Sequence, residues 1–445
     1  MMASKQNVYL ISLGCAKNLV DSENALGVLA VNGFPIVSSL EEAEIAIINT
    51  CAFIQSAVEE TIDTVLEVAA RKRSGKLKKL FVMGCFVQRY GYELLKEMPE
   101  VDGWLGTGEI CRIADILDSA FHEVPPFLIA KPGYLADHRT PRVQTTPFYS
   151  GYLKIAEGCS HRCTYCTISR LRGDYRSRDL ESILLEAEGM VERGVKEINL
   201  IAQDSTMYGN DLAEDVGLED LLERLLEIRG ISWIRVLYSH PYGISDRLLE
   251  LVDGQNAICS YLDIPLQHVN LEILEAMGRA PKEETPWQLI ERIRSKTGDL
   301  SLRTTMMVGF PGETDKSFRE LCDFVTAASF DHLGVFVFSP ERGTSAARFE
   351  NRVERKVAEE RLDSIMRLQA EISERKRQKM VGQIVPVLVE GQSPETDLLL
   401  TGRTAGMAPD VDGRVLINKG QAMLGDIVPV MIRQAYAYDV IGEIL

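Results

Sequence analysis

The chain has 445 residues, 45% of them hydrophobic and 26% charged, a composition typical of globular domains that bury large cores. No apolar run approaches the roughly 18 residues of a membrane span, and the N-terminus lacks the apolar core and cleavage site of a secretory signal, so we expect a cytoplasmic protein without a membrane partner. The formal net charge of −16 argues mildly against a nucleic-acid substrate and for a basic partner, although a local basic groove can hide in an acidic total.

Residues 1–122 alternate between apolar segments typical of buried strands and segments with helical periodicity. This alternation predicts an N-terminal domain with a parallel α/β sheet of flavodoxin-like type. The expected strands are residues 8–13, 43–49, 79–83 and 104–108, and the expected helices are residues 18–31, 57–73 and 92–98.

A cysteine follows each of the first three expected strands: Cys15, Cys51 and Cys85. Because the carboxyl ends of parallel strands share one edge of a sheet, these three thiols can converge. Each also lies at an expected helix start, where a thiolate is favoured. The pattern predicts a three-cysteine iron–sulfur site, and the alternative is three separate structural cysteines.

The chain has nine cysteines, a number that indicates metal or redox chemistry rather than disulfides in a cytoplasmic protein. We expect Cys111, Cys259 and Cys322 to be core residues, because they lie among apolar neighbours. Residues 123–148 are dominated by proline, glycine and polar residues, which predicts a linker that packs against its neighbours.

Residues 149–380 again alternate between strand-like and helix-like segments, which predicts an open (β/α)6 barrel with its function at the carboxyl ends of the strands. A long charged helix over residues 354–380 is expected to lead out of the barrel. The expected strands are residues 152–156, 197–202, 233–237, 261–265, 301–308 and 332–338, with helices between them such as 180–193, 218–228, 246–252 and 285–297.

Three closely spaced cysteines, Cys159, Cys163 and Cys166, follow the first barrel strand with the spacing Cys-x3-Cys-x2-Cys. Three thiolates can hold three corners of a cubane iron–sulfur cluster and leave one iron open to a reactant. A zinc site is the alternative, but such sites usually close with four ligands in two pairs, and no fourth cysteine follows nearby. His161, inside the triplet, could scarcely reach the same ion as both neighbours.

The triplet, with the aromatic Tyr165 before its third cysteine, resembles the motif of the radical S-adenosylmethionine (SAM) superfamily. The resemblance implies a [4Fe-4S] cluster whose open iron chelates the amine and carboxylate of SAM. It further implies that reductive cleavage of SAM yields a 5′-deoxyadenosyl radical, and that Tyr165 contacts SAM.

Other strand ends supply further expected contacts with SAM. Gln203 follows the second barrel strand, and a glycine-rich turn with Gly309 and Gly312 follows the fifth and lets the backbone approach adenosine closely. Arg303, within the fifth strand, could face the lumen and pair with a carboxylate of SAM. His240 and His268 follow the third and fourth strands, where a structural role is as consistent with the pattern as a functional one.

A basic run over residues 170–178 follows the triplet. Such runs are usually solvated loops, and a role in shaping the substrate entrance is the alternative.

Residues 381–445 predict a small antiparallel β-barrel of OB-like type. From residue 382 onward it has eight acidic and four basic residues, whereas RNA-binding modules normally carry a basic footprint. A basic protein therefore fits it better, and the acidic turn in residues 409–415 could meet that partner. The expected strands are residues 385–389, 398–403, 414–417, 426–432 and 437–441.

The order of these three parts resembles the methylthiotransferases over nearly the whole chain, and the C-terminal part resembles their TRAM domain. The resemblance implies that Cys15, Cys51 and Cys85 hold a second [4Fe-4S] cluster, which supplies or carries sulfur that a second SAM methylates. One branch of the family modifies an adenosine of tRNA, and the other modifies an aspartate of small-subunit ribosomal protein twelve.

The sequence Ser12-Leu-Gly-Cys-Ala-Lys-Asn-Leu-Val-Asp-Ser-Glu resembles the ribosomal-protein branch, whose motif reads Gly-Cys-x-Lys-Asn-x-Val-Asp-Ser-Glu, as do residues 157–163 and Arg172-Gly-Asp. The tRNA branch has glutamine and methionine near Lys17-Asn18. The resemblance implies methylthiolation of the β-carbon of an aspartate in that basic protein, an electron donor such as a flavodoxin or ferredoxin, and no direct tRNA substrate.

Two alternatives remain open: a tRNA adenosine methylthiotransferase and a non-catalytic iron–sulfur scaffold. We assign no protein acid or base, because the carbon–hydrogen bond must be broken by the cofactor.

Overall fold

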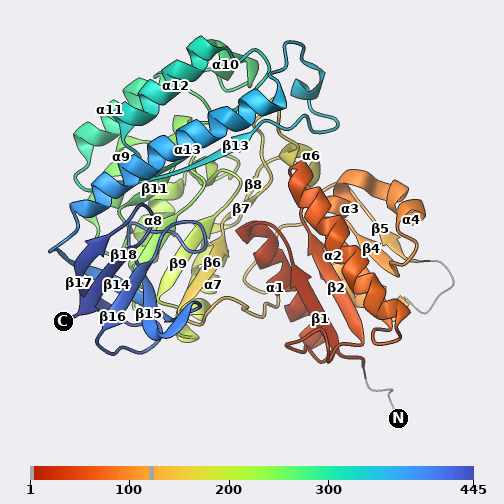
Figure 1. Ribbon diagram of the computed structural model, residues 1–445. Coiled ribbons are helices and arrows are strands. Elements are labelled where there is room, and N and C mark those ends of the chain that lie inside the picture. The colour runs from red at the N-terminus through yellow and green to blue at the C-terminus, as the bar shows by residue number, and fades with distance from the viewer. Residues whose placement is uncertain (1–4, 120–124) are drawn as a thin grey trace.

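The computed structural model describes residues 5–119 and 125–445 and has three parts that follow one another along the chain (Figure 1). The N-terminal α/β unit, red and orange, lies beside an open α/β barrel, yellow to light blue. The small C-terminal β-barrel, dark blue, lies against the lower end of the α/β barrel. No helix among the described residues is long and apolar enough to cross a membrane.

The N-terminal unit is a parallel five-stranded sheet with helices on both faces. Alternate residues of a strand point to opposite faces, so Ile47 packs with Leu29 of α1 on one face and Ile48 packs with Val65 of α2 on the other. The strands are β1 (Val8–Ser12), β2 (Ile45–Thr50), β3 (Lys79–Gly84), β4 (Gly103–Leu105) and β5 (Phe127–Leu128), and the helices are α1 (Ala16–Val31), α2 (Gln55–Arg73), α3 (Cys85–Tyr90), α4 (Leu94–Glu97) and α5 (Ile113–Ser119).

The layered parallel sheet agrees with the expected fold class. Ile36, which follows α1, forms a parallel bridge with Val8 at the outer edge of β1. With this segment counted second along the chain, the sheet begins with the order 2-1-3-4-5 of flavodoxin, and β5 adds a sixth position. The fifth strand, β5, lies within residues 123–148, so part of the expected linker belongs to the sheet. The expected boundary at residue 122 falls outside the described residues.

The middle part is the expected open barrel of six parallel strands. Two three-stranded sheets, β6-β9-β10 and β11-β12-β13, meet through a bridge between Ile234 and Ile258. The strands are β6 (Ser150–Lys154), β9 (Glu197–Ile201), β10 (Trp233–Val236), β11 (Tyr261–Asp263), β12 (Ser301–Val308) and β13 (His332–Val337). The surrounding helices are α6 (Ile168–Arg172), α7 (Leu180–Glu192), α8 (Leu218–Leu226), α9 (Asp246–Gly254), α10 (Leu271–Ala276), α11 (Pro286–Lys296), α12 (Asp315–Ala328) and α13 (Arg355–Gln378).

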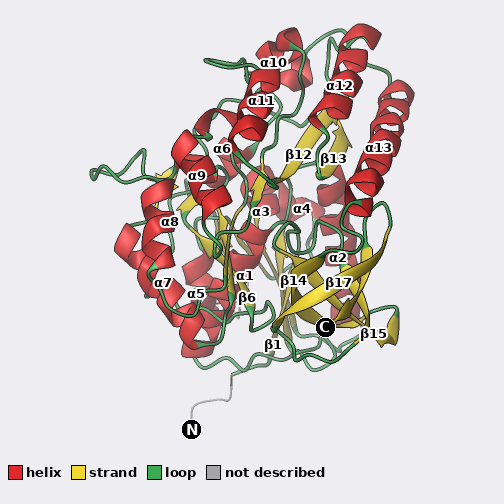
Figure 2. Ribbon diagram, turned by 90° about the vertical axis from the view of Figure 1, so that its left-hand side faces the viewer, coloured by secondary structure: helices red, strands yellow, loops and turns green. Residues whose placement is uncertain are grey.

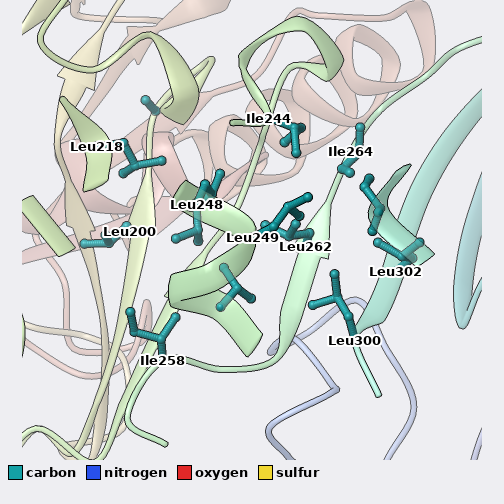
Figure 3. Packing of buried hydrophobic residues seen from close by; sticks show 14 of the residues in the cluster. Leu200, Leu218, Ile244, Leu248, Leu249, Ile258, Leu262, Ile264, Leu300 and Leu302 are labelled. Atoms are coloured by element: carbon teal, nitrogen blue, oxygen red, sulfur yellow. The ribbon is translucent and has the colours of Figure 1, made fainter. Parts of the chain in front are cut away.

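Outward-facing residues of the strands form the main core with the surrounding helices. Figure 3 shows Leu200, Leu262 and Leu302 of the strands packed with residues such as Leu248 and Leu249 of α9. The inner face of the barrel is polar by contrast. The strand residues that alternate with the outward-facing ones point inward, and they include the buried charged residues Glu197, Arg235 and Asp263. A polar interior of this kind is suited to function rather than to stability.

A short antiparallel hairpin, β7 (Ala156–Glu157) with β8 (Arg176–Ser177), was not expected from the sequence. It brackets the loop that carries the cysteine triplet. Two-residue strands give no periodic signal, which explains why the pattern did not reveal it.

The C-terminal part is a closed barrel in the order β14-β15-β16-β18-β17, with β16 and β18 parallel, and it confirms the OB-like expectation. Helix α13 leads to it, and both views show α13 running from the upper barrel down toward β17 (Figures 1 and 2). The strands are β14 (Ile384–Ser393), β15 (Thr396–Thr404), β16 (Val415–Lys419), β17 (Ile427–Ala435) and β18 (Val440–Ile444).

Within the acidic turn expected to meet a basic partner, the Asp412 side chain is buried against this chain's own barrel, whereas Asp410 and Val411 are exposed. The Asp412 carboxylate accepts a hydrogen bond from the Tyr261 hydroxyl (2.9 Å), lies 3.1 Å from His332 Nδ1 and pairs with Arg303. Asp412 is therefore already paired within the chain, and a contact between the exposed part of the turn and a basic partner stays a prediction.

A second buried ion cluster, centred on Glu197 of β9, joins the two barrels. Its carboxylate lies 2.6 Å from Arg403 Nη2 of β15 and 3.1 Å from Arg235 Nη2 of β10. Burial raises the pKa of Glu197, but the charges of Arg403 and Arg235 lower it further, to about 2.

This depressed pKa predicts a loss of stability in acid. The pKa of Glu197 is lower in the folded state than in the unfolded state. Its contribution to the free energy of unfolding is therefore complete above about pH 4.5 and declines as the pH falls toward 2. We expect Glu197→Gln to be less stable than the wild type at pH 7, and the difference in unfolding free energy to narrow by about 2 kcal/mol by pH 3. Urea unfolding of the metal-free proteins at both pH values measures this, and a difference independent of pH would contradict it.

The three cysteines expected in the core differ in their burial. Cys259 is buried and Cys322 is half-buried against the main core, as expected. Cys111 is exposed, so its assignment to the core was wrong. It lies in a short 3-10 helix whose neighbours Ile110 and Ile113 point inward in its place.

Candidate active site

The triplet of Cys159, Cys163 and Cys166 occupies the loop between β7 and α6, at the carboxyl end of β6. Backbone hydrogen bonds fix the loop: Cys159 N donates to Gly173 O (3.0 Å), and Cys166 N donates to Cys163 O (3.1 Å). Gly158 precedes the triplet with a φ of +84°, and a Cβ there would lie 2.1 Å from Asp174 O, so only glycine fits.

The three half-buried thiols lie in one short loop, in which a backbone hydrogen bond joins Cys166 to Cys163. Burial raises the pKa of Cys159 to about 11 and that of Cys166 to about 12. Arg279 Nη1 lies 3.8 Å from Cys163 Sγ and offsets negative charge there. Thiols of this kind ionise when they bind metal, which releases their protons. The donor set therefore fits three ligands of an iron–sulfur cluster.

His161 anchors the triplet to neighbouring strand ends. Its Nε2 lies 2.7 Å from Asp204 Oδ2, and its ring stacks on His240 with centroids 4.0 Å apart and planes 15° apart. A histidine nitrogen binds a metal ion in the plane of its ring. Because the two stacked rings lie in nearly parallel planes, one ion cannot lie in the plane of both rings. We assign the three side chains to positioning the loop rather than to a separate metal site. His240 thus has a positioning role.

Next to the triplet, the strand ends carry buried polar atoms without hydrogen-bond partners among the described residues: Gln203 Oε1, Ser239 Oγ and Gln267 Oε1. Two residues here are non-glycine residues with positive φ, Tyr238 at +62° and Gln267 at +71°. Such strain gathers at functional sites. Unpaired buried acceptors and donors fit a polar ligand such as SAM, which would satisfy them.

Gln203 is oriented toward this region by its amide, which donates to Glu157 Oε1 (2.7 Å). Tyr165 packs against an apolar cluster with Ile273 and Met277, and burial raises the pKa of its hydroxyl. Ser239 and Gln267 were not among the expected SAM contacts, and only their polar character at strand ends could have identified them.

Gly309 and Arg303, two of the expected SAM contacts, make other contacts within the chain. A Cβ on Gly309 would lie 2.5 Å from Ala358 Cβ of α13, and its N–H donates to the Glu313 carboxylate. Arg303 is near the amino end of β12, so it faces the C-terminal barrel, where it pairs with Asp412. Gly312 has a φ of +90° and open space where its Cβ would be.

The N-terminal cysteines Cys15, Cys51 and Cys85 are brought together at the carboxyl edge of β1, β2 and β3. A Cβ on Gly14 would lie 3.1 Å from Cys51 Sγ, which shows how closely the first two loops approach. The pKa of Cys85 is affected by both Cys15 and Cys51. The Asn18 side chain lies among the three loops: its Oδ1 is 3.8 Å from Cys85 Sγ, and its amide donates to Thr50 O beside Cys51 (2.8 Å).

The three N-terminal thiols differ in exposure and in charge. Burial raises the pKa of Cys51, and it raises that of Cys85 to about 12. For exposed Cys15 the surrounding protein atoms also raise the pKa, but the charges of Lys17 and Arg172 outweigh them and the net direction is down. Cys15 is therefore the thiol most readily ionised at the open side of this site.

Arg172 of α6 links the two cysteine sets. Its buried guanidinium pairs with Asp21 and donates to Asn18 Oδ1, both on α1, and it lies 3.5 Å from Glu157 Oε2. Its charge also acts on all three N-terminal thiols. The next residue, Gly173, accepts the hydrogen bond from Cys159.

The solvated-loop interpretation of residues 170–178 was thus wrong for two arginines. Arg172 is 4% and Arg178 3% exposed, because carboxylates from other elements pair with them. The partner of Arg178 is Glu186 of α7, at 2.6 Å.

Three family models match successive stretches of the chain. Residues 7–106 match an uncharacterized protein family, UPF0004, residues 153–325 match the radical SAM superfamily, and residues 381–445 match the TRAM domain. These matches agree with the three parts of the fold.

Curated relatives match the chain from end to end. The "ribosomal protein uS12 methylthiotransferase RimO" of Pelobacter propionicus is 47% identical over 99% of this chain and 98% of its own length. The protein of the same name from Geobacter sulfurreducens is 46% identical over the full length of both chains. Among solved structures, the radical SAM methyltransferase TsrM from Kitasatospora setae, with cobalamin and a [4Fe-4S] cluster bound, covers 77% of each chain with a TM-score of 0.54 and 14% identity, which shows a shared fold.

Proposed function

We propose that this chain, which belongs to the RimO family of ribosomal protein uS12 methylthiotransferases, adds a methylthio group to the β-carbon of an aspartate in uS12. It is a transferase of the radical SAM superfamily, whose members use a [4Fe-4S] cluster and SAM. The observation that carries the proposal is that two three-cysteine sets lie on either side of Arg172, whose contacts reach α1 beside the N-terminal set and Glu157 beside the triplet.

In this proposal Cys159, Cys163 and Cys166 hold the first cluster. When bound, this cluster and SAM supply a 5′-deoxyadenosyl radical, which is needed because a carbon–hydrogen bond at an unactivated carbon resists acid–base chemistry. The chain's own residues fix the geometry: His161 anchors the cysteine loop through Asp204, and the unpaired polar atoms of Gln203, Ser239 and Gln267 bind the polar groups of SAM.

Cys15, Cys51 and Cys85 hold a second [4Fe-4S] cluster in this proposal, which supplies or carries the sulfur that a second SAM methylates. The support is the donor set itself: three thiols at one sheet edge, with the Arg172 guanidinium to balance their charge once they ionise. Buried apolar side chains from all three parts, such as Val20, Tyr152 and Leu388, pack around α1 and exclude water near the junction.

The remaining partners follow from this chemistry. Reduction of the first cluster requires an external electron donor, such as a flavodoxin or ferredoxin. Because the substrate is a ribosomal protein, we place the reaction in the cytoplasm.

A competition assay tests the substrate. The reconstituted, reduced enzyme is incubated with SAM and an equimolar mixture of uS12 and tRNA, and both products are analysed by mass spectrometry. We expect a methylthio group on an aspartate of uS12 alone, and methylthiolation of tRNA alone would refute the proposal. Failure to form 5′-deoxyadenosine from SAM would instead support a non-catalytic scaffold.

A cysteine variant separates the roles of the two sets. We expect Cys15→Ala to retain SAM cleavage to 5′-deoxyadenosine and to lose methylthiolation of uS12, because it lacks one ligand of the second set only. Chromatography of 5′-deoxyadenosine and mass spectrometry of uS12 measure the two activities. Cys111→Ala, at an exposed cysteine of the same domain, is the matched control and should retain both. Full methylthiolation by Cys15→Ala would rule out the second-cluster role.

A further inference from the structure

Lys17 is a buried cation at the junction of the N-terminal unit and the barrel. It lies in the first turn of α1, two residues after Cys15. Its ammonium lies 3.0 Å from the centroid of the Tyr238 ring, and the whole residue is only 7% exposed. The strained backbone of Tyr238, with a φ of +62°, holds that ring at the end of β10.

Within the described residues, the Lys17 ammonium has no carboxylate within 4.0 Å and donates no hydrogen bond, so the aromatic contact is its one close interaction. A buried ammonium has three donors to satisfy, and an unpaired one is costly. The other buried cations of the junction differ, since Lys154 contacts Asp21 and Glu157, and Arg172 contacts the same two carboxylates.

The two carboxylates whose charge reaches Lys17 are already engaged elsewhere. Asp263 accepts from Tyr238 N (3.3 Å) and lies 3.9 Å from Arg303 Nε. Glu157 lies 2.8 Å from Lys154 Nζ and accepts from Gln203 (2.7 Å). Among the described residues the Lys17 ammonium is therefore left without a carboxylate partner, and the nearby Cys15 thiol is the charged group that acts on it most strongly.

We propose that Lys17 binds the side-chain carboxylate of the target aspartate, an inference that rests on the proposed function. Lys17 follows Cys15 of the second set by two residues, and its ammonium contacts Tyr238, whose neighbour Ser239 is one of the SAM contacts proposed above. A substrate carbon that must meet both cofactors has to lie in the same region. In aspartate the carboxylate is attached directly to the β-carbon, so holding the carboxylate places the reacting carbon.

The carboxylate of SAM carries the same negative charge as the aspartate side chain. The experiment therefore distinguishes which of these two carboxylates Lys17 binds. The wild-type holoenzyme and Lys17→Met, both loaded with clusters and SAM, are compared on uS12 and on a uS12 variant in which the modified aspartate is asparagine. Binding of each form of uS12 is measured directly, and iron content and KM for SAM are recorded. Lys78→Met, at an exposed lysine paired with Glu44 in the same unit, is the matched control.

We expect the wild type and Lys78→Met to bind the aspartate form on the order of 100-fold more tightly than the asparagine form. Lys17→Met should bind both forms within a few-fold of each other, with iron content and KM for SAM unchanged. The proposal is overturned if the wild type does not distinguish the two forms, which needs no enzyme variant, or if Lys17→Met keeps the distinction. The proposal is equally overturned if Lys17→Met binds less iron than the wild type, or if its KM for SAM is tenfold higher. If the wild type fails to modify uS12 at all, the proposed function itself is wrong.

Discussion

We expect Cys163→Ala to form about 100-fold less 5′-deoxyadenosine from SAM than the wild type, or less still. Mutating a residue that only supports a metal ligand typically lowers activity by about 10- to 100-fold, and loss of a ligand itself should cost more. Cys163 is the middle ligand of the triplet, and the backbone of its loop is fixed by hydrogen bonds that do not involve its side chain. The variant should therefore keep its fold while losing one of three thiolate ligands. Uncoupled SAM cleavage, measured by chromatography after reduction with dithionite, reports this directly.

The control for this experiment is Cys322→Ala, which removes a half-buried thiol far along the chain from both sets. It should retain normal cleavage and normal iron content. Cys163→Ala should retain the iron of the N-terminal set, roughly four atoms per chain. Normal cleavage by Cys163→Ala would mean that the triplet does not hold the cluster that activates SAM.

Arg172→Met is expected to destabilise the metal-free protein by about 3–5 kcal/mol and to lower the iron content of the N-terminal set. Removing one partner of a buried ion network leaves buried charges without compensation. In this variant Lys154 would be the one cation still paired with both Asp21 and Glu157. Because the Arg172 charge also acts on Cys15, Cys51 and Cys85, the ionised thiols would lose the positive charge that stabilises them. Urea unfolding and iron analysis of the reconstituted protein measure the two effects.

Arg162→Met is the matched control, because Arg162 lies in the same cysteine loop but is exposed, with Asp174 3.6 Å away. An exposed ion pair of this kind contributes little to the free energy of unfolding. Arg162→Met should therefore change that free energy by no more than about 0.5 kcal/mol. Equal stability of the Arg172 and Arg162 variants would show that the junction does not depend on the buried network.

The sequence predicted the convergence of the N-terminal cysteines for a sound physical reason. Cys15, Cys51 and Cys85 each follow a buried strand, and parallel strands end at one edge of a sheet whatever their order. The prediction therefore does not depend on which of the strands pair with each other. The triplet was equally clear, since its spacing within one loop does not depend on tertiary structure.

The partners of buried charges could not be predicted in the same way. Arg303 lies in a strand whose two faces the pattern distinguishes, but its partner Asp412 comes from a different part of the chain. Arg172 looked like one member of a solvated basic run until Asp21, more than 100 residues earlier, was found beside it. Such pairs depend on how the three parts dock, which local periodicity does not encode.

Mass spectrometry of uS12 from cells that lack the gene for this chain tests the central claim most directly. We predict that uS12 from these cells lacks one methylthio group on an aspartate, that the wild-type gene restores it and that the Cys15→Ala gene does not. An unchanged mass of uS12 in the deletion strain, or a loss of methylthiolation confined to tRNA, would contradict the assignment of uS12 as the substrate.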